Sequence, residues 1–76
     1  MRLHVDKLAD ALYLRLDDTP IVESSEVSPG IILDYDERKE VVGVEILGLS
    51  RRSPRIDLDT LLFQTVPAAN GSEPVT

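Results

Sequence analysis

Three carboxylates lie close together in the most regular stretch of the sequence, residues 30–47 (GIILDYDERKEVVGVEIL). Asp34, Asp36 and Glu45 alternate there with apolar side chains. A Mg²⁺ site can be built from one or two carboxylates with water or phosphate, whereas Ca²⁺ takes more oxygen ligands. The stretch therefore raises two hypotheses, a metal or catalytic site and the polar face of a β-hairpin.

The alternation of this stretch predicts a hairpin that turns at Arg38-Lys39. One face would then be apolar, with the pairs Tyr35–Val42, Leu33–Val44 and Ile31–Ile46. On the other face Asp34 lies across from Gly43, and Glu45 lies across from Ile32. A slip of one residue would bury charge, so the pattern selects this register. We expect the carboxylates to spread over a solvated face without forming a metal site, and Gly43 to mark a close approach or a bulge.

Two further aspartates, Asp6 and Asp10, flank a short connection, DKLAD. Aspartate side chains accept hydrogen bonds from nearby backbone amides, so both residues are expected to stabilise a turn. No nucleophile and base pair accompanies them, because His4 is the only histidine and cysteine is absent. We predict no catalytic residues and no cofactor, and no two-histidine metal site can form within one chain.

A basic cluster follows the hairpin, at Arg51, Arg52 and Arg55. Because Asp57 and Asp59 come next, the arginines are expected to form local ion pairs, each worth less than about 1 kcal/mol. The alternative is a recognition patch for an acidic partner or for nucleic acid.

Period-2 alternation predicts short strands that position these residues. The expected strands are 2–5, 11–16, 21–27 and the two arms of the hairpin, with the polar 21–27 segment at an edge. Residues 48–55 could hold one helical turn limited by Pro54, and Asp57 is expected to cap a short helix from about residue 58. Residues 61–66 also carry strand formers, so a strand is the alternative within residues 57–66. The fold class predicted is α+β, a four- to five-stranded antiparallel, mostly meander sheet followed by one or two short helices. Residues 1–66 are expected to form one domain and residues 67–76 a disordered tail.

Composition restricts the classes of function. The net charge is −6, so the chain as a whole is a poor match for nucleic acid phosphates. No apolar run is long enough for a signal peptide or a membrane span, which predicts a cytoplasmic protein.

The apolar face of the sheet also predicts a partner. A short helix carrying Leu58, Leu61 and Leu62 would cover only part of this face, and large exposed apolar patches are rare on monomers. We therefore expect a homodimer. The predicted face consists of Leu3, Val5, Leu12, Leu14, Leu16, Ile31, Leu33, Tyr35, Val42, Val44 and Ile46.

Two passages, DKLADALYLRL and VSPGIILDYDERKEVVGVEIL, resemble a small prokaryotic family called domain of unknown function 2283. The matching residues are Asp6, Ala9, Asp10, Ala11, Leu12, Tyr13, Pro29, Gly30, Asp34, Gly43, Glu45, Ile46 and Leu47. The chain departs from the family at the hairpin turn, where Arg38-Lys39 replaces an Asn-Gly-like pair. Either Lys39 adopts a left-handed conformation, or the four residues ERKE form a type I loop. The family has no established activity, and the frequent proximity of its genes to small toxin-like reading frames implies an antitoxin-like role.

Three functions are compatible with the sequence. The first is a non-enzymatic protein–protein interaction module, an antitoxin-like partner of a small basic protein steered by the acidic charge. The second is a metal-dependent enzyme that uses Asp34 and Glu45. The third is a dimeric DNA-binding regulator that uses the arginine cluster.

Overall fold

The computed structural model describes residues 1–67, which form one five-stranded antiparallel sheet and one short helix. The elements are β1 (Arg2–Asp6), β2 (Ala11–Arg15), β3 (Glu23–Ser28), β4 (Ile31–Tyr35), β5 (Val41–Leu47) and α1 (Leu49–Arg52). The predicted antiparallel sheet is confirmed, although the helical part of the predicted α+β fold is only four residues long. Of the tail predicted to be disordered, residues 68–76 lie outside the described residues.

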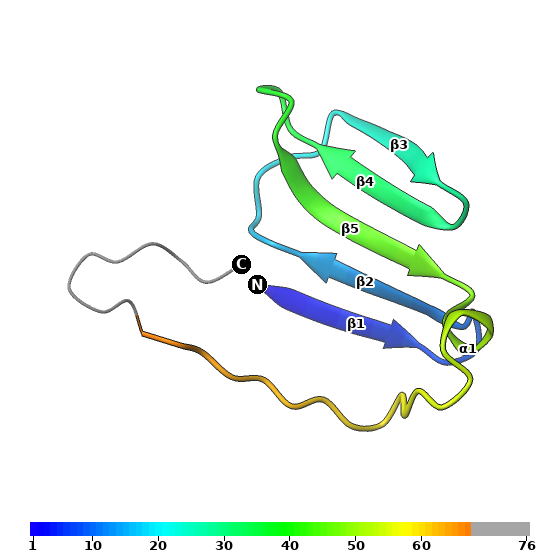
Figure 1. Ribbon diagram of the computed structural model, residues 1–76. Coiled ribbons are helices and arrows are strands. Elements are labelled where there is room, and N and C mark those ends of the chain that lie inside the picture. The colour runs from blue at the N-terminus through cyan, green and yellow to red at the C-terminus, as the bar shows by residue number, and fades with distance from the viewer. Residues whose placement is uncertain (68–76) are drawn as a thin grey trace.

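The strands lie in the order β1-β2-β5-β4-β3 (Figure 1). The predicted meander holds within β1–β2 and within β3–β4–β5 but is wrong between β2 and β3, because β5 pairs with both β2 and β4. Residues 16–22 therefore carry the chain from β2 to the far edge of the sheet. The prediction of a polar edge strand is confirmed by β3, all six residues of which are exposed.

The register of the β4–β5 hairpin follows the apolar alternation, with Ile31 opposite Ile46, Leu33 opposite Val44 and Asp34 opposite Gly43. The prediction fails at the next pair, because Tyr35 lies opposite Val41 and not Val42. The extra residue on β5 forms a bulge beside Gly43.

The hairpin turn accounts for the bulge, because it pairs Asp36 with Glu40, whereas the apolar alternation pairs Asp34 with Gly43. Lys39 adopts φ 64°, the left-handed conformation that was one of the two expected solutions. Its amide donates to the Asp36 carbonyl at 3.0 Å, and the Asp36 amide donates to the Glu40 carbonyl at 3.0 Å. This is a three-residue loop that closes with a left-handed residue, a common alternative to the two-residue turn.

Helix α1 follows β5 directly through Gly48, whose φ of 67° reverses the chain. The prediction of one helical turn within residues 48–55 is thus confirmed. Figure 1 shows α1 at one end of the sheet, and it covers neither face. No helix in the described part of the chain has the length and apolar character needed to cross a membrane.

The helix predicted from about residue 58 is not present, since residues 57–66 form neither helix nor strand. Asp57 does act as a local cap, because its carboxylate accepts from the Asp59 amide at 2.9 Å and from the Thr60 hydroxyl at 2.8 Å. The turn ends there, and no helix continues it to pack Leu61 and Leu62 on the sheet, so these side chains are 66% and 77% exposed.

The apolar side chains of the sheet form two rows on one face. The rows are Leu3–Leu14–Val44–Leu33 and Val5–Leu12–Ile46–Ile31. Seven of these eight residues are half-buried and Val5 is 37% exposed. Within residues 1–67 no large side chain is completely buried. The sheet is therefore a single layer whose apolar face has no second layer of its own chain across it.

Candidate functional site

The carboxylate of Asp34 lies on the polar face of the sheet, but it is not solvated as expected. Its exposed fraction is 8%. The Tyr13 hydroxyl donates to Oδ2 at 2.6 Å, and the Ser24 hydroxyl donates to Oδ1 at 2.5 Å. The expectation of a wet carboxylate is wrong because hydroxyls from β2 and β3 cover it from both sides. Tyr13, Asp34 and Ser24 form what we call the carboxylate cluster.

Gly43 makes the carboxylate cluster possible. It lies on β5 between β2 and β4, opposite both Arg15 and Asp34. A Cβ atom at this position would lie 2.7 Å from the Tyr13 hydroxyl and 2.9 Å from Asp34 Oδ2. The missing side chain leaves the space through which the tyrosine reaches the carboxylate. The predicted close approach at Gly43 is confirmed, and so is the predicted bulge beside it.

The hydrogen bond to Asp34 raises the pKa of Tyr13 above its ordinary value of 10.0. Ionising the phenol would remove the donated proton and place a second negative charge beside the carboxylate. Burial raises the pKa further, while the neighbouring Arg15 lowers it. Tyr13 is therefore a neutral hydrogen-bond donor near pH 7.

Arg15 itself is buried, with 8% exposure, and it stabilises a loop. Its guanidinium donates to the carbonyl of Asp17 at 2.7 Å and to that of Thr19. These two backbone carbonyls take donors of the guanidinium.

Asp36 is also buried, with 7% exposure, so the solvated position expected for it is wrong. One carboxylate oxygen accepts from the amides of Arg38 and Glu40, both at 2.9 Å. These contacts close the β4–β5 turn around Lys39, and they give Asp36 a structural task.

The three carboxylates do not converge. Glu45 is half-buried in a different row of the polar face, opposite Tyr13 and Ile32. Across residues 1–67, no group of three or more acidic or histidine side chains is arranged to hold a metal ion. Each oxygen of Asp34 accepts one hydroxyl hydrogen bond, so the carboxylate serves as an acceptor within the cluster.

Asp6 stabilises the β1–β2 turn as expected, because the Ala9 amide donates to its carboxylate at 2.9 Å. The same expectation for Asp10 is wrong, because its carboxylate bonds a residue outside the turn. Asp10 adopts φ 54° and has a task that the sequence did not reveal. Its carboxylate accepts from the Ser50 amide at 3.1 Å and from the Ser50 hydroxyl at 2.7 Å, and its carbonyl accepts from the Leu49 amide at 3.0 Å. Asp10 therefore caps α1 from forty residues away in the sequence.

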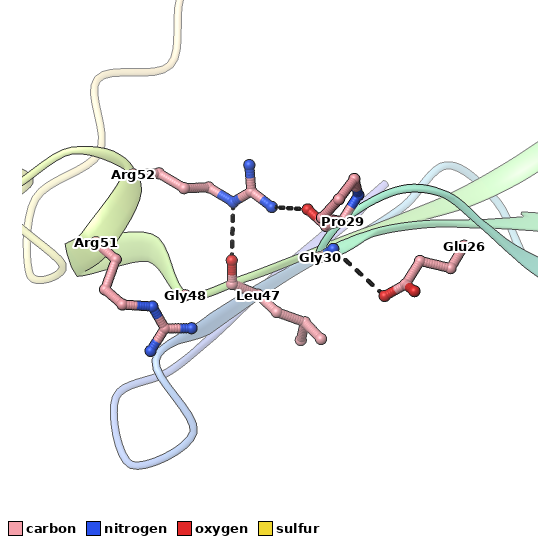
Figure 2. Close-up of a pocket in the computed structure, with 7 residues that line it drawn as sticks. All are labelled: Glu26, Pro29, Gly30, Leu47, Gly48, Arg51 and Arg52. Atoms are coloured by element: carbon pink, nitrogen blue, oxygen red, sulfur yellow. Dashed lines mark hydrogen bonds between the residues drawn. The ribbon is translucent and has the colours of Figure 1, made fainter.

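The arginine cluster is divided between different tasks. Arg52 donates from Nε to the Leu47 carbonyl at 2.8 Å and from Nη2 to the Pro29 carbonyl (Figure 2). The predicted ion pairs with Asp57 and Asp59 do not form in the described structure, where Asp59 pairs with Lys7 instead. Arg52 thus ties α1 to the β3–β4 turn.

An open pocket of about 480 Å³ lies at this end of the sheet. Arg51 and Arg52 of α1 and Glu26 of β3 are among the residues that line the pocket, as Figure 2 shows. Arg55 is not among its lining residues. The pocket offers charges of both signs but no nucleophile with an adjacent base, so it provides binding groups and no catalytic pair.

The apolar face of the sheet is only partly covered within the described residues. Beside the two half-buried rows, a pocket of about 380 Å³ lies between Leu3, Val5 and Leu12 of the sheet and residues 56–61. Residues 56–61 thus lie near the β1–β2 side of the face and leave the rows on β5 and β4 without a cover. This arrangement suits the docking of another apolar surface.

Comparison with known proteins places the chain in a family. Residues 2–50, which include all five strands, match the family described as "Protein of unknown function (DUF2283)". No curated protein and no solved structure matches the chain. The matched segment contains the carboxylate cluster, the Asp10 cap and both apolar rows, whereas Arg51, Arg52 and Arg55 lie beyond it. The chain therefore belongs to the DUF2283 family of proteins of unknown function.

Proposed function

We propose that this chain is a non-enzymatic protein–protein interaction module, and that its apolar sheet face docks on the same face of a second copy. The observation that carries the proposal is the pair of apolar rows across β1, β2, β5 and β4, which have no cover on β5 and β4. A surface of this kind favours association because removing apolar area from water is worth roughly 25 cal/mol per Å².

The size of the chain supports an added subunit. A domain of this length buries only about 60% of the surface that its unfolded chain exposes, so it gains from disulfides, metals or association. Cysteine is absent, and the described residues hold no metal-ligand group. Of these three sources of added stability, association with another subunit remains.

The chemistry of the face supports a sheet-on-sheet contact. The rows end on β3 at Ser25 and Ser28, which pair with Leu33 and Ile31, so the face carries no charge in either row. Two such faces can stack about 10 Å apart with strands roughly 30° from parallel, as in β-sandwiches. A two-fold axis would make the contact self-complementary.

The test compares adjacent residues on opposite faces. Leu33→Thr removes apolar area from the proposed interface, and Ile32→Thr makes the same type of change on the polar face. Sedimentation equilibrium should show a wild-type dimer at micromolar concentration, weakened by at least about tenfold in Leu33→Thr and little changed in Ile32→Thr. A strictly monomeric wild-type protein would refute the proposal.

The acidic charge supports a basic partner for this module, as in an antitoxin-like role. Glu23 and Glu26 lie exposed on the free edge strand β3, and the whole chain carries a net charge of −6. Charges of this kind steer association more than they hold a complex together. Binding of a basic partner should slow with added salt, and the double change Glu23→Lys/Glu26→Lys should reduce the association rate more than the dissociation rate.

The metal-dependent enzyme and the DNA-binding regulator gain no support from the site. The Asp34 oxygens are bonded to hydroxyls, and Arg52 is bonded to two backbone carbonyls. A divalent-metal thermal shift lost in Asp34→Asn would favour the first of them. Salt-sensitive DNA binding lost in Arg51→Ala/Arg52→Ala would favour the second.

A further inference from the structure

Two arginines of α1 line one open pocket at the end of the sheet, and each lies over a glycine. Arg51 and Arg52 both border this pocket of about 480 Å³, as do Gly30 and Gly48 (Figure 2). A Cβ atom on Gly48 would lie 2.6 Å from Nη2 of Arg51, and one on Gly30 would overlap Nη2 of Arg52. The two missing side chains therefore leave the room in which the two guanidinium groups lie.

The guanidinium of Arg52 is fixed in position by backbone carbonyls. Its Nε donates to the Leu47 carbonyl at 2.8 Å, and its Nη2 donates to the Pro29 carbonyl. A guanidinium has five N–H donors in all, and Nη1 of Arg52 makes no hydrogen bond within residues 1–67. Arg52 thus supplies an oriented positive charge with donors that no carbonyl takes.

The side chain of Arg51 makes no hydrogen bond or ion pair in the described part of the chain, where the one ion pair joins Lys7 and Asp59. Glu26 borders the same pocket from β3, and its carboxylate accepts from the Gly30 amide at 3.3 Å. It pairs with neither arginine. The pocket therefore holds two positive charges and one negative charge that do not neutralise one another by contact.

We infer that this pocket binds a small molecule through one oxyanion group, a carboxylate or a phosphate, with Arg51 as the free donor and Arg52 as the fixed charge. The planar guanidinium fork matches the oxygen spacing of both groups. The pocket has the volume of a small-molecule site, about 300–1,000 Å³. Glu26 repels further negative charge, so the ligand carries a single such group and is not a nucleic acid. Because these residues lie at the end of the sheet, the site does not require the dimer.

NMR titrations of the whole chain test the site, one with inorganic phosphate and one with sodium acetate, both at constant ionic strength. We expect saturable shifts of the Gly30 and Gly48 amides and of the Nε signals of Arg51 and Arg52. Arg51→Gln should weaken binding by at least about tenfold, because it removes a charge-assisted hydrogen bond. Arg55→Gln is the matched control, since it changes the charge equally and Arg55 does not line the pocket. Its affinity should equal that of the wild type.

A second pair of variants tests the role of Glu26. Glu26→Gln removes the negative charge at the pocket and keeps an oxygen that can accept from the Gly30 amide. It should tighten phosphate binding by about threefold or more, because the repulsion of the anion is lost. Glu23→Gln makes the same change on the same strand, outside the pocket lining, and should have a smaller effect.

Tighter binding of phosphate than of acetate would assign a phosphate-bearing ligand, and the reverse order would assign a carboxylate-bearing one. Either order, combined with the loss in Arg51→Gln, supports the site. The absence of saturable shifts with both anions overturns it. Equal affinities of Arg51→Gln and Arg55→Gln, or equal gains in Glu26→Gln and Glu23→Gln, would show that only net charge matters, and this also overturns the site.

Discussion

The Tyr13 hydroxyl lies 2.6 Å from Asp34 Oδ2 and reaches it across the strand that separates them. Tyr13 belongs to β2 and Asp34 to β4, and neither strand pairs with the other. The contact passes over Gly43 of β5, and Ser24 extends the same carboxylate cluster to β3. One side-chain network thus links three strands, β2, β4 and β3, and passes over a fourth, β5, on the polar face.

Gly43→Ala should lower the free energy of unfolding by about 2 kcal/mol, because the added methyl overlaps the Tyr13–Asp34 contact. The new Cβ would lie under 3.0 Å from both polar atoms. Urea denaturation followed by circular dichroism measures the loss. In a Tyr13→Phe background the hydroxyl is missing, so the same substitution should cost distinctly less. Equal costs in the two backgrounds would contradict the steric explanation.

Stability should fall with pH above about 10 through the raised pKa of Tyr13. The folded protein holds the phenolic proton more tightly than the unfolded chain, which uses the ordinary value of 10.0. The contribution is complete below pH 10, where both states are protonated, and it is lost as pH rises toward the folded pKa. Urea midpoints between pH 8 and pH 11 should decline more steeply for wild type than for Tyr13→Phe. Parallel profiles would show that Tyr13 does not carry this dependence.

Asp10→Ala should destabilise the protein by about 1–2 kcal/mol, because it removes the cap on α1 and places alanine at a positive φ. Asp10→Asn is the matched variant, since asparagine tolerates this conformation and keeps a side-chain acceptor. It should lose less than half as much. NMR shifts of the Ser50 amide, which donates to Asp10 at 3.1 Å, should move in Asp10→Ala and much less in Asp10→Asn. An unaffected Ser50 amide in Asp10→Ala would argue against the long-range cap.

Lys39→Gly should stabilise the protein by about 1 kcal/mol, because glycine adopts a φ of 64° without the penalty that a Cβ brings. Arg38→Gly is the control at the preceding position, which does not have a positive φ. That change should be neutral or destabilising, since it only adds freedom to the unfolded chain. Urea midpoints of both variants decide the question, and equal stabilisation by the two glycines would contradict the turn geometry.

The register of β4 and β5 was predictable from Ile31 to Asp34, though not at Tyr35, because one face is apolar. Leu33 and Val44 must share a face, and a slip would bury the neighbouring charges. The burial of Asp34 was not predictable in this way, because alternation shows only which face a side chain occupies. The cover comes from Tyr13 and Ser24, whose strands lie on either side of the β4–β5 pair, and only the strand order reveals that arrangement.

The C-terminal segment was misjudged for a related reason. Asp57 with acidic neighbours is a pattern typical of a helix start, and its side chain does cap a turn. Short helices, however, gain most of their stability from packing on other elements. Residues 61–66 do not pack as a helix on the sheet of their own chain, and the side chains of Leu61 and Leu62 remain exposed.

The lack of any completely buried large side chain within residues 1–67 has a consequence for the amount of folded protein in a cell. If association supplies the missing burial, mass action ties folding to copy number. Dilution would then act as a denaturant, and the folded fraction would rise with expression level. Chains made in excess of their partners would spend more time open and be removed faster by proteases. Because the sheet is a single layer, the fraction of chains that stay folded would thus depend on how many copies the cell contains.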